Sequence, residues 1–424
     1  MSSPRLVLYG HFGVGNLGND STLEAMLYNI RKYQPSANVI CVCTGPQVVT
    51  QRYGIDTLPI DIAEDRNIRQ QPSGVLRKAI RVTTRIIDEI NFWLKRIRWF
   101  RSIDQFLVVG TGALDDMAVI HPWNAPYDLF KWCHAAKLGG AKVVFLSVGA
   151  GPIENRISRA LMLNALRVAN YRSYRDLESQ EYLRNVGFET LGDSLYPDLV
   201  FSLPEEAAPY SHVNVAKPQV VGLGVINYYG WRHDTSSGEP IYQGYLAKLK
   251  HFVQWLLAQG YAVRLLSGDS TDQRPVDELL EFISTEGQAG WQSYIFVEPI
   301  ADLEDLLEQI AKTDIVVASR FHNLLCALML GRPVVSIGYH SKNDALLTEM
   351  GLQAYCQHIE NFDVDRLIQQ FQLLSSELPL ASHRIQQKCD QNRELLEEQY
   401  RRIFLAESEP EHVPPTTILA GLKE

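Results

Sequence analysis

Short apolar runs alternate with segments of helical periodicity along most of the chain. The runs have the length of strands, and they occupy residues 5–10, 38–44, 106–109, 141–148, 219–226, 261–267, 314–318 and 333–337. Between them, apolar residues recur at helical spacing, for example over residues 129–138, 158–169 and 242–259. Because continuous apolar strands joined by helical crossovers need cover on both faces, the pattern indicates parallel sheets. It predicts an α/β fold of two doubly wound, Rossmann-like domains.

A stretch with three prolines, residues 203–218, divides this alternation into two series. We therefore predict a first domain over residues 1–205, a linker over 206–218 and a second domain over 219–380. We expect a charged helix over 381–407 to pack back across the domains, and 408–424 to form a flexible tail. Such sheets bind ligands at the carboxyl ends of their strands, so the cleft between the domains is the expected ligand site.

Composition and charge exclude several classes of protein. Of the 424 residues, 46% are hydrophobic and 21% are charged, which excludes disorder over most of the length. The net charge of −9 argues against nucleic-acid binding, for which a basic surface is typical. The six cysteines form no CxxC pair, and no run of 18 apolar residues occurs. We therefore expect a cytoplasmic protein with reduced thiols.

Residues 66–101 depart from this composition. They contain ten Arg or Lys against two acidic residues, a local charge of +8 that leaves −17 on the rest of the chain. Their Ile, Phe and Trp residues recur at helical spacing, which predicts a basic amphipathic helical insertion in the first domain. Two interpretations stay open. One is peripheral contact with the inner face of the cytoplasmic membrane, and the other is a helix packed on the protein with its cations exposed.

The first predicted strand leads into a loop rich in Gly and Asn at residues 10–20. Glycines let backbone N–H groups approach an anion closely, and the helix expected from Ser21 adds its positive end. The loop is not a clean GxGxxG and no acidic residue ends the second strand, which disfavours a plain Rossmann dehydrogenase. A tight strand-to-helix turn is the alternative interpretation. The candidate substrate-binding residues in this loop are Gly15, Asn16, Gly18 and Asn19.

Two more glycine clusters follow strands in the first domain, at residues 110–116 and 149–152. Each cluster alone is more typical of a turn than of a site. Together they would line several strand ends with backbone donors, an edge that suits phosphate. The candidates here are Gly112, Asp116, Gly149 and Gly151.

Cationic residues also follow strands in both halves. Residues 172–176 contain two arginines and directly precede a predicted helix. A guanidinium can hold a carboxylate or phosphate bidentately, so Arg175 is a candidate for substrate binding. The alternative interpretation is an ion pair between Arg175 and Asp176 on the surface. Arg320 and His322 follow the run at 315–317 and precede an apolar helix over 323–330, so we expect both beside a helix N-terminus. Lys342 follows the next strand. No set of His, Cys, Asp and Glu has metal-ligand spacing, so we expect no metal.

In this order, the motifs resemble those of the polysaccharide pyruvyltransferase family over about residues 5–355. The elements similar to the family's are residues 13–20, 110–116, 149–152, Arg175-Asp176, Pro197-Asp198, Arg320-Phe321-His322 and 333–342. The sequence departs from the family's pattern at Asn19, where the family usually has Asp, at Thr111 within the glycine run, and at Phe321, where the family has Leu.

The resemblance implies a GT-B-like pair of domains, phosphoenolpyruvate as the donor and a saccharide acceptor, in a polysaccharide or its lipid-linked precursor. It implies no cofactor beyond the donor substrate. Arg320, Arg175 and Lys342 would hold the donor's carboxylate and phosphate, and Arg320 would also be catalytic, because with Arg175 it would stabilise the charge that develops in the reaction. His322 would act as acid and base, since histidine can give and take a proton near pH 7. His121 is a further candidate for substrate binding.

Two other functions stay open. A glycosyltransferase of the same architecture would use a nucleotide sugar, and Glu298 or Asp302 could bind its ribose. A non-catalytic scaffold of a glycan pathway would keep the fold and bind glycan or enzyme partners. The departures at Asn19 and Thr111 are consistent with that second alternative.

Overall fold

The computed structural model describes residues 3–60, 75–115, 121–204, 219–230, 235–288 and 290–405. Contacts divide the chain into two units. Unit 1 contains Met1–Val14, Met26–Asp198 and Tyr400–Glu424, and unit 2 contains Gly15–Ala25 and Leu199–Gln399. This division differs from the predicted domains in three respects: Gly15–Ala25 group with unit 2, the first unit ends at Asp198 instead of residue 205, and the end of the last helix groups with unit 1. The predicted linker at 206–218 and tail at 408–424 lie outside the described residues.

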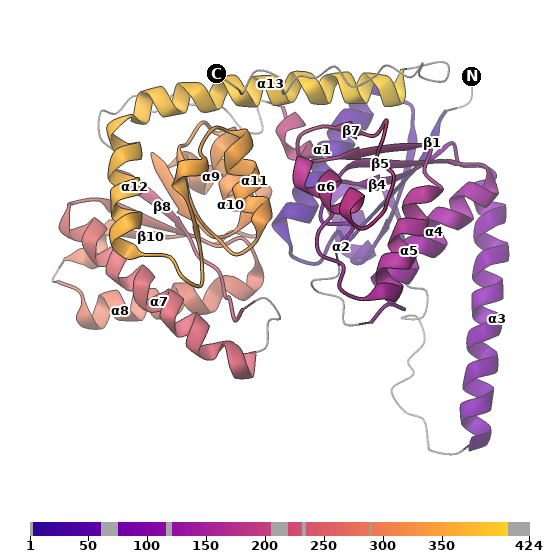
Figure 1. Ribbon diagram of the computed structural model, residues 1–424, viewed down its shortest axis with the longest axis horizontal. Helices are drawn as coiled ribbons and strands as arrows, with labels where there is room; N and C mark the ends of the chain where they lie inside the picture. Colours follow the sequence, from indigo (N-terminus) through magenta and orange to yellow (C-terminus); the bar gives the residue numbers. More distant parts are fainter. Residues whose placement is uncertain are drawn as a thin grey trace. The chain divides into compact units, whose positions relative to one another are not determined.

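Unit 1 is built on a parallel sheet with the strand order β3-β2-β1-β4-β5-β6-β7 (Figure 1). Its strands are β1 (Arg5–Gly10), β2 (Asn38–Cys43), β3 (Asp56–Pro59), β4 (Gln105–Val109), β5 (Lys142–Val148), β6 (Tyr171–Tyr174) and β7 (Ser194–Leu195). The helices between them are α1 (Leu17–Tyr33), α2 (Pro46–Tyr53), α3 (Val75–Phe100), α4 (Ala125–Gly139), α5 (Arg156–Arg167) and α6 (Leu177–Asn185). Helix α4 packs between α3 and α5.

Unit 2 has a second parallel sheet with the order β10-β9-β8-β11-β12-β13. Its strands are β8 (Val220–Gly224), β9 (Ala262–Leu266), β10 (Ile295–Val297), β11 (Ile315–Ala318), β12 (Val334–Gly338) and β13 (Cys356–His358). Its helices are α7 (Thr235–Ala258), α8 (Gln273–Glu286), α9 (Leu303–Ala311), α10 (Phe321–Met329), α11 (Ser341–Glu349), α12 (Val364–Ser376) and α13 (Leu378–Phe404). Helix α7 contacts both α8 and α12, and helix α10 contacts both α9 and α11, so the helices form two layers (Figure 1).

The predicted fold class, two doubly wound parallel sheets, is confirmed, and the differences concern element ends and short strands. The helix predicted from Ser21 begins at Leu17, because the side-chain oxygen of Asn16 accepts the N–H of Asn19 at 3.1 Å and caps the helix. The helix predicted from Asn323 begins at Phe321. Edge strands such as β7, with 2 residues, are too short to leave a pattern in the sequence.

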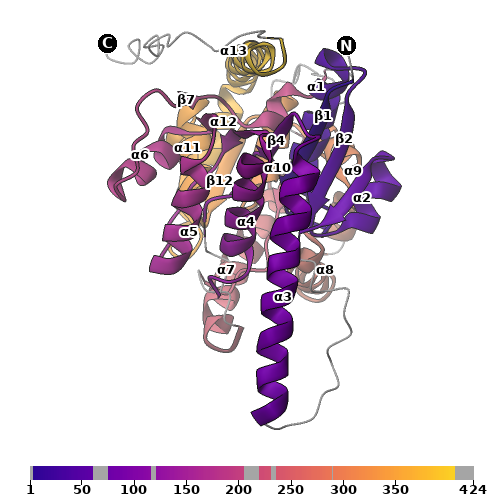
Figure 2. The ribbon, with the colours of Figure 1, turned by 90° about the vertical axis from the view of Figure 1, so that its right-hand side faces the viewer.

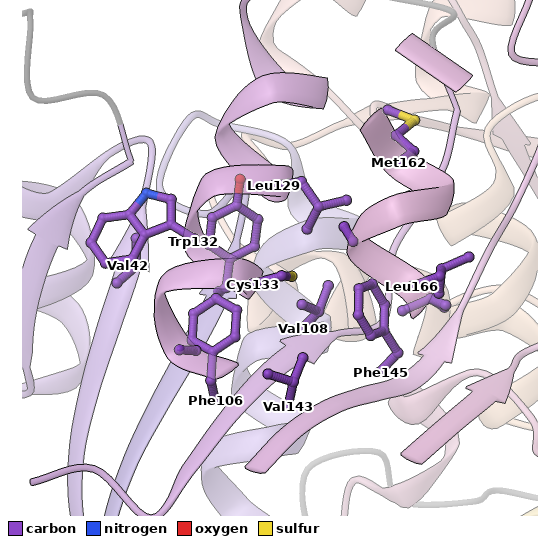
Figure 3. Packing of buried hydrophobic residues seen from close by; sticks show 14 of the residues in the cluster. Val42, Phe106, Val108, Leu129, Trp132, Cys133, Val143, Phe145, Met162 and Leu166 are labelled. Carbon is purple, nitrogen blue, oxygen red and sulfur yellow. The ribbon is translucent and has the colours of Figure 1, made fainter. Parts of the chain in front are cut away.

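The core of unit 1 lies between its sheet and helices α4 and α5 (Figure 3). Trp132 of α4 is fully buried at its centre, and its indole N–H donates to the carbonyl of Ile60 at 3.1 Å. The ring meets Phe92 and Phe100 of α3 edge-on, at centroid distances of 5.3 and 6.2 Å. These contacts anchor the C-terminal half of α3 to the domain.

We expect Trp132→Ala to lower the free energy of unfolding by about 3–5 kcal/mol, because it removes a buried aromatic ring and leaves a cavity. Trp123→Ala is the matched control, since Trp123 is 58% exposed and its loss should change stability by about 0.5 kcal/mol or less. Urea denaturation followed by circular dichroism measures both. Equal destabilisation by the two variants would contradict the packing described.

Candidate active site

The carboxyl ends of β8 and β11 form the switch point of the unit 2 sheet. The two strands are hydrogen-bonded neighbours, but the chain continues from β8 toward β9 on one side and from β11 toward β12 on the other. Ligands of doubly wound sheets bind at such a point, where the connections diverge. Arg320 and His322 follow β11 directly, so the structure places both candidates there.

Arg320 is held by a buried carboxylate that the sequence analysis did not single out. Its Nε lies 2.9 Å from Asp272 Oδ2 and its Nη2 lies 2.6 Å from Asp272 Oδ1. Asp272 is fully buried and also accepts the backbone N–H groups of Gly268 and Asn227. Burial alone would lower the pKa of Arg320, but the facing Asp272 raises this pKa above its ordinary value. The cation expected to bind substrate is therefore already ion-paired, with 18% of its side chain exposed.

His322 packs against the first turn of α1. A Cβ added to Gly18 would lie 1.8–2.1 Å from three atoms of the His322 ring, so any side chain at position 18 would displace the imidazole. The ring of Phe321 stands edge-on to the imidazole, with 5.1 Å between centroids. The structure thus brings together two candidates from distant parts of the chain, Gly18 of the first loop and His322.

The other candidates of the first loop shape this contact. Gly15 has a φ of +80°, a conformation that favours glycine. The side chain of Asn16 caps α1 through Asn19, and its backbone forms an isolated antiparallel bridge with Asp269, near Asp272. Asn16 thus satisfies part of the first turn of α1, whereas the N-cap of α10, Arg320, makes no side-chain cap hydrogen bond.

Asn323 lies in the first turn of α10 and is a second residue that the sequence analysis missed. It is fully buried, and neither its Oδ1 nor its Nδ2 has a hydrogen-bond partner among the described residues. An added Cβ on Gly268 would come within 2.9 Å of the Oδ1, and one on Gly224 within 2.7 Å of the Nδ2. Burying a polar group unpaired costs about 1–3 kcal/mol, so this amide is a candidate contact for a polar ligand group.

Lys342 follows β12 at the same edge of the sheet. Its Nζ lies over the ring of Phe321, 5.7 Å from the centroid, and over that of Tyr339 at 5.8 Å. His340 caps α11, and its Nδ1 accepts the N–H of Lys342 at 3.1 Å. Because Phe321 also contacts His322, one aromatic ring links the second cation to the candidate acid and base.

In unit 1, Arg175 lies between two carboxylates. Its Nε is 3.3 Å from Asp176 Oδ2 and its Nη1 is 3.5 Å from Asp198 Oδ2, and only 8% of its side chain is exposed. An added Cβ on Gly149 would lie 2.7 Å from the guanidinium, so the structure brings Gly149 and Arg175 together. Arg172 pairs with Asp193 instead. The Arg175–Asp176 pair considered as an alternative is thus present, but it is buried.

The glycine loops of unit 1 hydrogen-bond to each other. The N–H of Gly149 donates to the carbonyl of Thr111 at 2.7 Å, and that of Gly151 donates to Leu114 at 3.1 Å. Thr111 has a φ of +59°, which costs a residue with a side chain about 1–2 kcal/mol. These N–H groups, expected to face phosphate, therefore hold the two loops together.

The remaining candidates of unit 1 either make contacts that do not involve Arg175 or lie outside the described residues. Gly112 faces Asp115, whose Oδ2 would lie 2.5 Å from an added Cβ. His121 is exposed, and its carbonyl accepts the N–H of Asn124. Asp116 lies outside the described residues.

A sequence signal for Asp272 does exist. Residues 268–272 read Gly-Asp-Ser-Thr-Asp and directly follow the apolar run that became β9. Asp269 and Asp272 thus follow a strand of the same predicted sheet as Arg320, and this pattern indicates two possible carboxylate partners for the arginine. Asn323, by contrast, differs from an ordinary helical residue only in its surroundings, so its role needed the structure.

In the part of the chain that the structure describes, no three His, Cys, Asp or Glu side chains group closely enough to hold a metal ion. A reaction without metal or cofactor stays a prediction.

Solved structures with this architecture have two Rossmann-like domains of the GT-B class. The chain is similar to UDP-GlcNAc 2-epimerase from Methanocaldococcus jannaschii, with 9% identity and a TM-score of 0.56 over 93% of this chain and 98% of that one. It is similar to UDP-GlcNAc 2-epimerase from Neisseria meningitidis bound to UDP-GlcNAc, with 12% identity and a TM-score of 0.51 over 93% of this chain and 100% of that one. It is also similar to a glycosyltransferase from Rickettsia africae, with 13% identity and a TM-score of 0.53 over 96% and 100%. These identities show the fold alone.

The sequence itself identifies the family. Residues 16–341 match the polysaccharide pyruvyl transferase family, and the chain belongs to it. The match includes residues 16–20 of the first loop, Arg175, Arg320 and His322, and it confirms the resemblance seen in the motifs. No curated protein sequence matches the chain significantly. The protein is thus a transferase of the polysaccharide pyruvyl transferase family.

We expect Asp272→Asn to lower the free energy of unfolding by about 3–5 kcal/mol, because it leaves the Arg320 cation without a charged partner. Asp277→Asn is the matched control, since Asp277 is exposed on α8 and its Oδ1 accepts a hydrogen bond from Gln273. It should change stability by about 0.5 kcal/mol or less. Denaturant titration of the two variants measures the difference, and similar stabilities would refute the importance of the ion pair.

Proposed function

We propose that the protein transfers a pyruvyl group from phosphoenolpyruvate to a sugar residue of a polysaccharide, or of its lipid-linked precursor, forming a pyruvate ketal and releasing phosphate. One observation carries the proposal: Arg320, His322 and Asn323 all lie within four positions at the start of α10, at the switch point of the unit 2 sheet. Family membership supports the transferase class, while the donor and the ketal are our inference.

The chemistry of this helix start suits a donor with two anionic groups. The positive end of the α10 dipole, the exposed side of Arg320 and the Lys342 ammonium favour a phosphate or carboxylate. The buried amide of Asn323 offers a donor and an acceptor to the same ligand. Arg175 has two carboxylates around it, so its surroundings support a role in positioning Gly149 rather than in holding phosphate.

The reaction needs one group that gives and takes a proton. In the first step, His322 protonates the methylene carbon of phosphoenolpyruvate, which leaves an oxocarbenium-like C2, and a sugar hydroxyl bonds to C2 and gives its proton back to His322. In the second step, a neighbouring hydroxyl bonds to C2 as the C2–O bond to phosphate breaks, and its proton goes to the departing phosphate. Histidine suits this exchange because it titrates near pH 7.

The glycosyltransferase alternative has less support in this structure. Hydrogen bonds from Arg264, Gln309 and Lys312 engage Glu298 and lower its pKa to about 2. Asp302 caps α9 by accepting the N–H of Asp305. Both carboxylates proposed for a ribose therefore already have partners.

Thermal stabilisation tests the donor. Phosphoenolpyruvate at about 100 times its Kd should stabilise the protein by about 2.7 kcal/mol and raise its Tm, whereas UDP-, GDP- and CMP-sugars should leave Tm unchanged. Arg320→Ala should abolish the shift. Because this variant also leaves Asp272 unpaired, Lys342→Ala serves as a second variant and should weaken the shift.

A shift with a nucleotide sugar alone would make the protein a glycosyltransferase. Binding without turnover on any acceptor would favour the scaffold.

His322 and Gly18 can be tested together in a double-mutant cycle. His322→Ala should lower kcat by about 10²–10⁴-fold while the phosphoenolpyruvate shift in Tm persists. Gly18→Ala should lower kcat by about 10²-fold, because its methyl group displaces the imidazole. In the His322→Ala background, Gly18→Ala should have no further effect on phosphate release.

The control for this cycle is Gly244→Ala in α7, where an added Cβ meets nothing within 4 Å. It should leave kcat unchanged. Additive effects of Gly18→Ala and His322→Ala, or near-normal turnover of His322→Ala, would remove His322 from the proposed chemistry.

A further inference from the structure

Helix α3 has two apolar faces, and the site described above uses neither. The inner face packs on unit 1 through Phe92, which is 7% exposed, and Phe100, which is fully buried. Trp93, Ile97 and Trp99 pack against the same core. The predicted amphipathic face of the segment is therefore largely occupied from residue 92 onward. The interpretation of a helix packed on the protein holds for this face.

A second apolar stripe lies on α3 outside these contacts. Ile87, Ile90 and Leu94 are 50%, 53% and 65% exposed, and their spacing of three and four residues aligns them along the helix. Single exposed apolar residues are ordinary, but three in line on one helix form a continuous surface. We call these three residues the outer stripe.

The charges beside the outer stripe are mostly basic. Lys95, Arg98 and Arg101 are all exposed at its C-terminal end. Of the two acidic residues in the segment, Glu89 accepts a hydrogen bond from Tyr127 Oη at 2.7 Å and so faces α4, whereas Asp88 is exposed next to Ile87. The segment's charge of +8 contrasts with −17 on the rest of the chain. An anionic surface would therefore attract α3 and repel most of the remaining surface.

The placement of α3 leaves this helix accessible. Figures 1 and 2 show its N-terminal part extending past the other elements of unit 1, while its C-terminal part lies along α4. No helix among the described residues is long and apolar enough to span a bilayer. A helix with an apolar stripe and basic flanks can instead lie in the plane of a membrane interface.

We propose that α3 binds the surface of an anionic membrane, with the outer stripe inserted among the acyl chains and Lys95, Arg98 and Arg101 against the lipid phosphates. The charge of the segment favours lipid over a second copy of this chain, because two α3 helices would repel each other. The proposal goes beyond the catalytic function and stands without it.

Vesicle co-sedimentation of the full-length protein tests the proposal. The protein should bind phosphatidylcholine vesicles that contain phosphatidylglycerol, should bind pure phosphatidylcholine vesicles far more weakly, and should dissociate as salt is raised. The triple variant Lys95→Glu, Arg98→Glu, Arg101→Glu should weaken binding by about 10²-fold or more. The triple variant Ile87→Gln, Ile90→Gln, Leu94→Gln should abolish the binding that remains at high salt.

The matched control carries Leu138→Gln and Lys142→Glu, which change an exposed leucine and an exposed lysine of unit 1 outside α3. It should bind vesicles like the unaltered protein, and the Tm of every variant should stay the same. Equal vesicle binding by the α3 variants and the control would overturn the proposal. So would an absence of vesicle binding together with self-association that the Gln variant removes, since the outer stripe would then join two copies. Phosphoenolpyruvate stabilisation should persist in all variants, which separates this proposal from the catalytic one.

Discussion

The ion pair between Arg320 and Asp272 fixes the candidate site of unit 2, and the other contacts depend on it. Removing two charges from water costs several kcal/mol per ion, so such a pair persists only with good geometry and further hydrogen bonds. Asp272 meets both conditions, because it binds Arg320 bidentately and accepts backbone N–H groups that follow β8 and β9. One carboxylate thus ties together the ends of three strands. Arg320 is also the N-cap of α10, so this link fixes the positions of His322 and Asn323.

The fold could be predicted from the sequence because its central strands are buried on both faces. β11 and β12 are wholly buried; β11 has no polar residue and β12 has only Ser336, so both appear in the sequence as short apolar runs. Helix starts were harder, since a cap is a single hydrogen bond. The glycine loop predicts that Asn16 contacts a ligand, and the structure shows that its side chain caps the N-terminus of α1. The short edge strands also escaped prediction, because two or three residues carry no period.

The candidate site was only partly predictable for a related reason. Arg320 and His322 follow a strand and precede a helix, which is a local pattern that one stretch of sequence displays. The partners Asp272 and Gly18 come from other elements, and nothing in their own neighbourhoods indicates which side chain they meet. The sequence pattern predicts a role for the backbone N–H of Gly18, whereas the structure gives a steric reason for glycine, because the imidazole of His322 lies against its Cα. The pattern of residues along the chain does not indicate which distant segments contact each other.

The two arginines that the sequence treats alike differ in their electrostatic surroundings. Arg175 lies beside the carboxylates of Asp176 and Asp198, so an anion approaching it would meet a group whose charge is more than balanced. Arg320 has one directly paired carboxylate and keeps part of its surface exposed, beside the positive end of α10. A cation held in place before the ligand arrives needs little reorganisation, which is the property that strengthens electrostatic stabilisation in a reaction. The same ion pair that lowers the net charge at Arg320 therefore also holds its guanidinium in place, which favours Arg320 over Arg175 in the proposed binding of a donor anion.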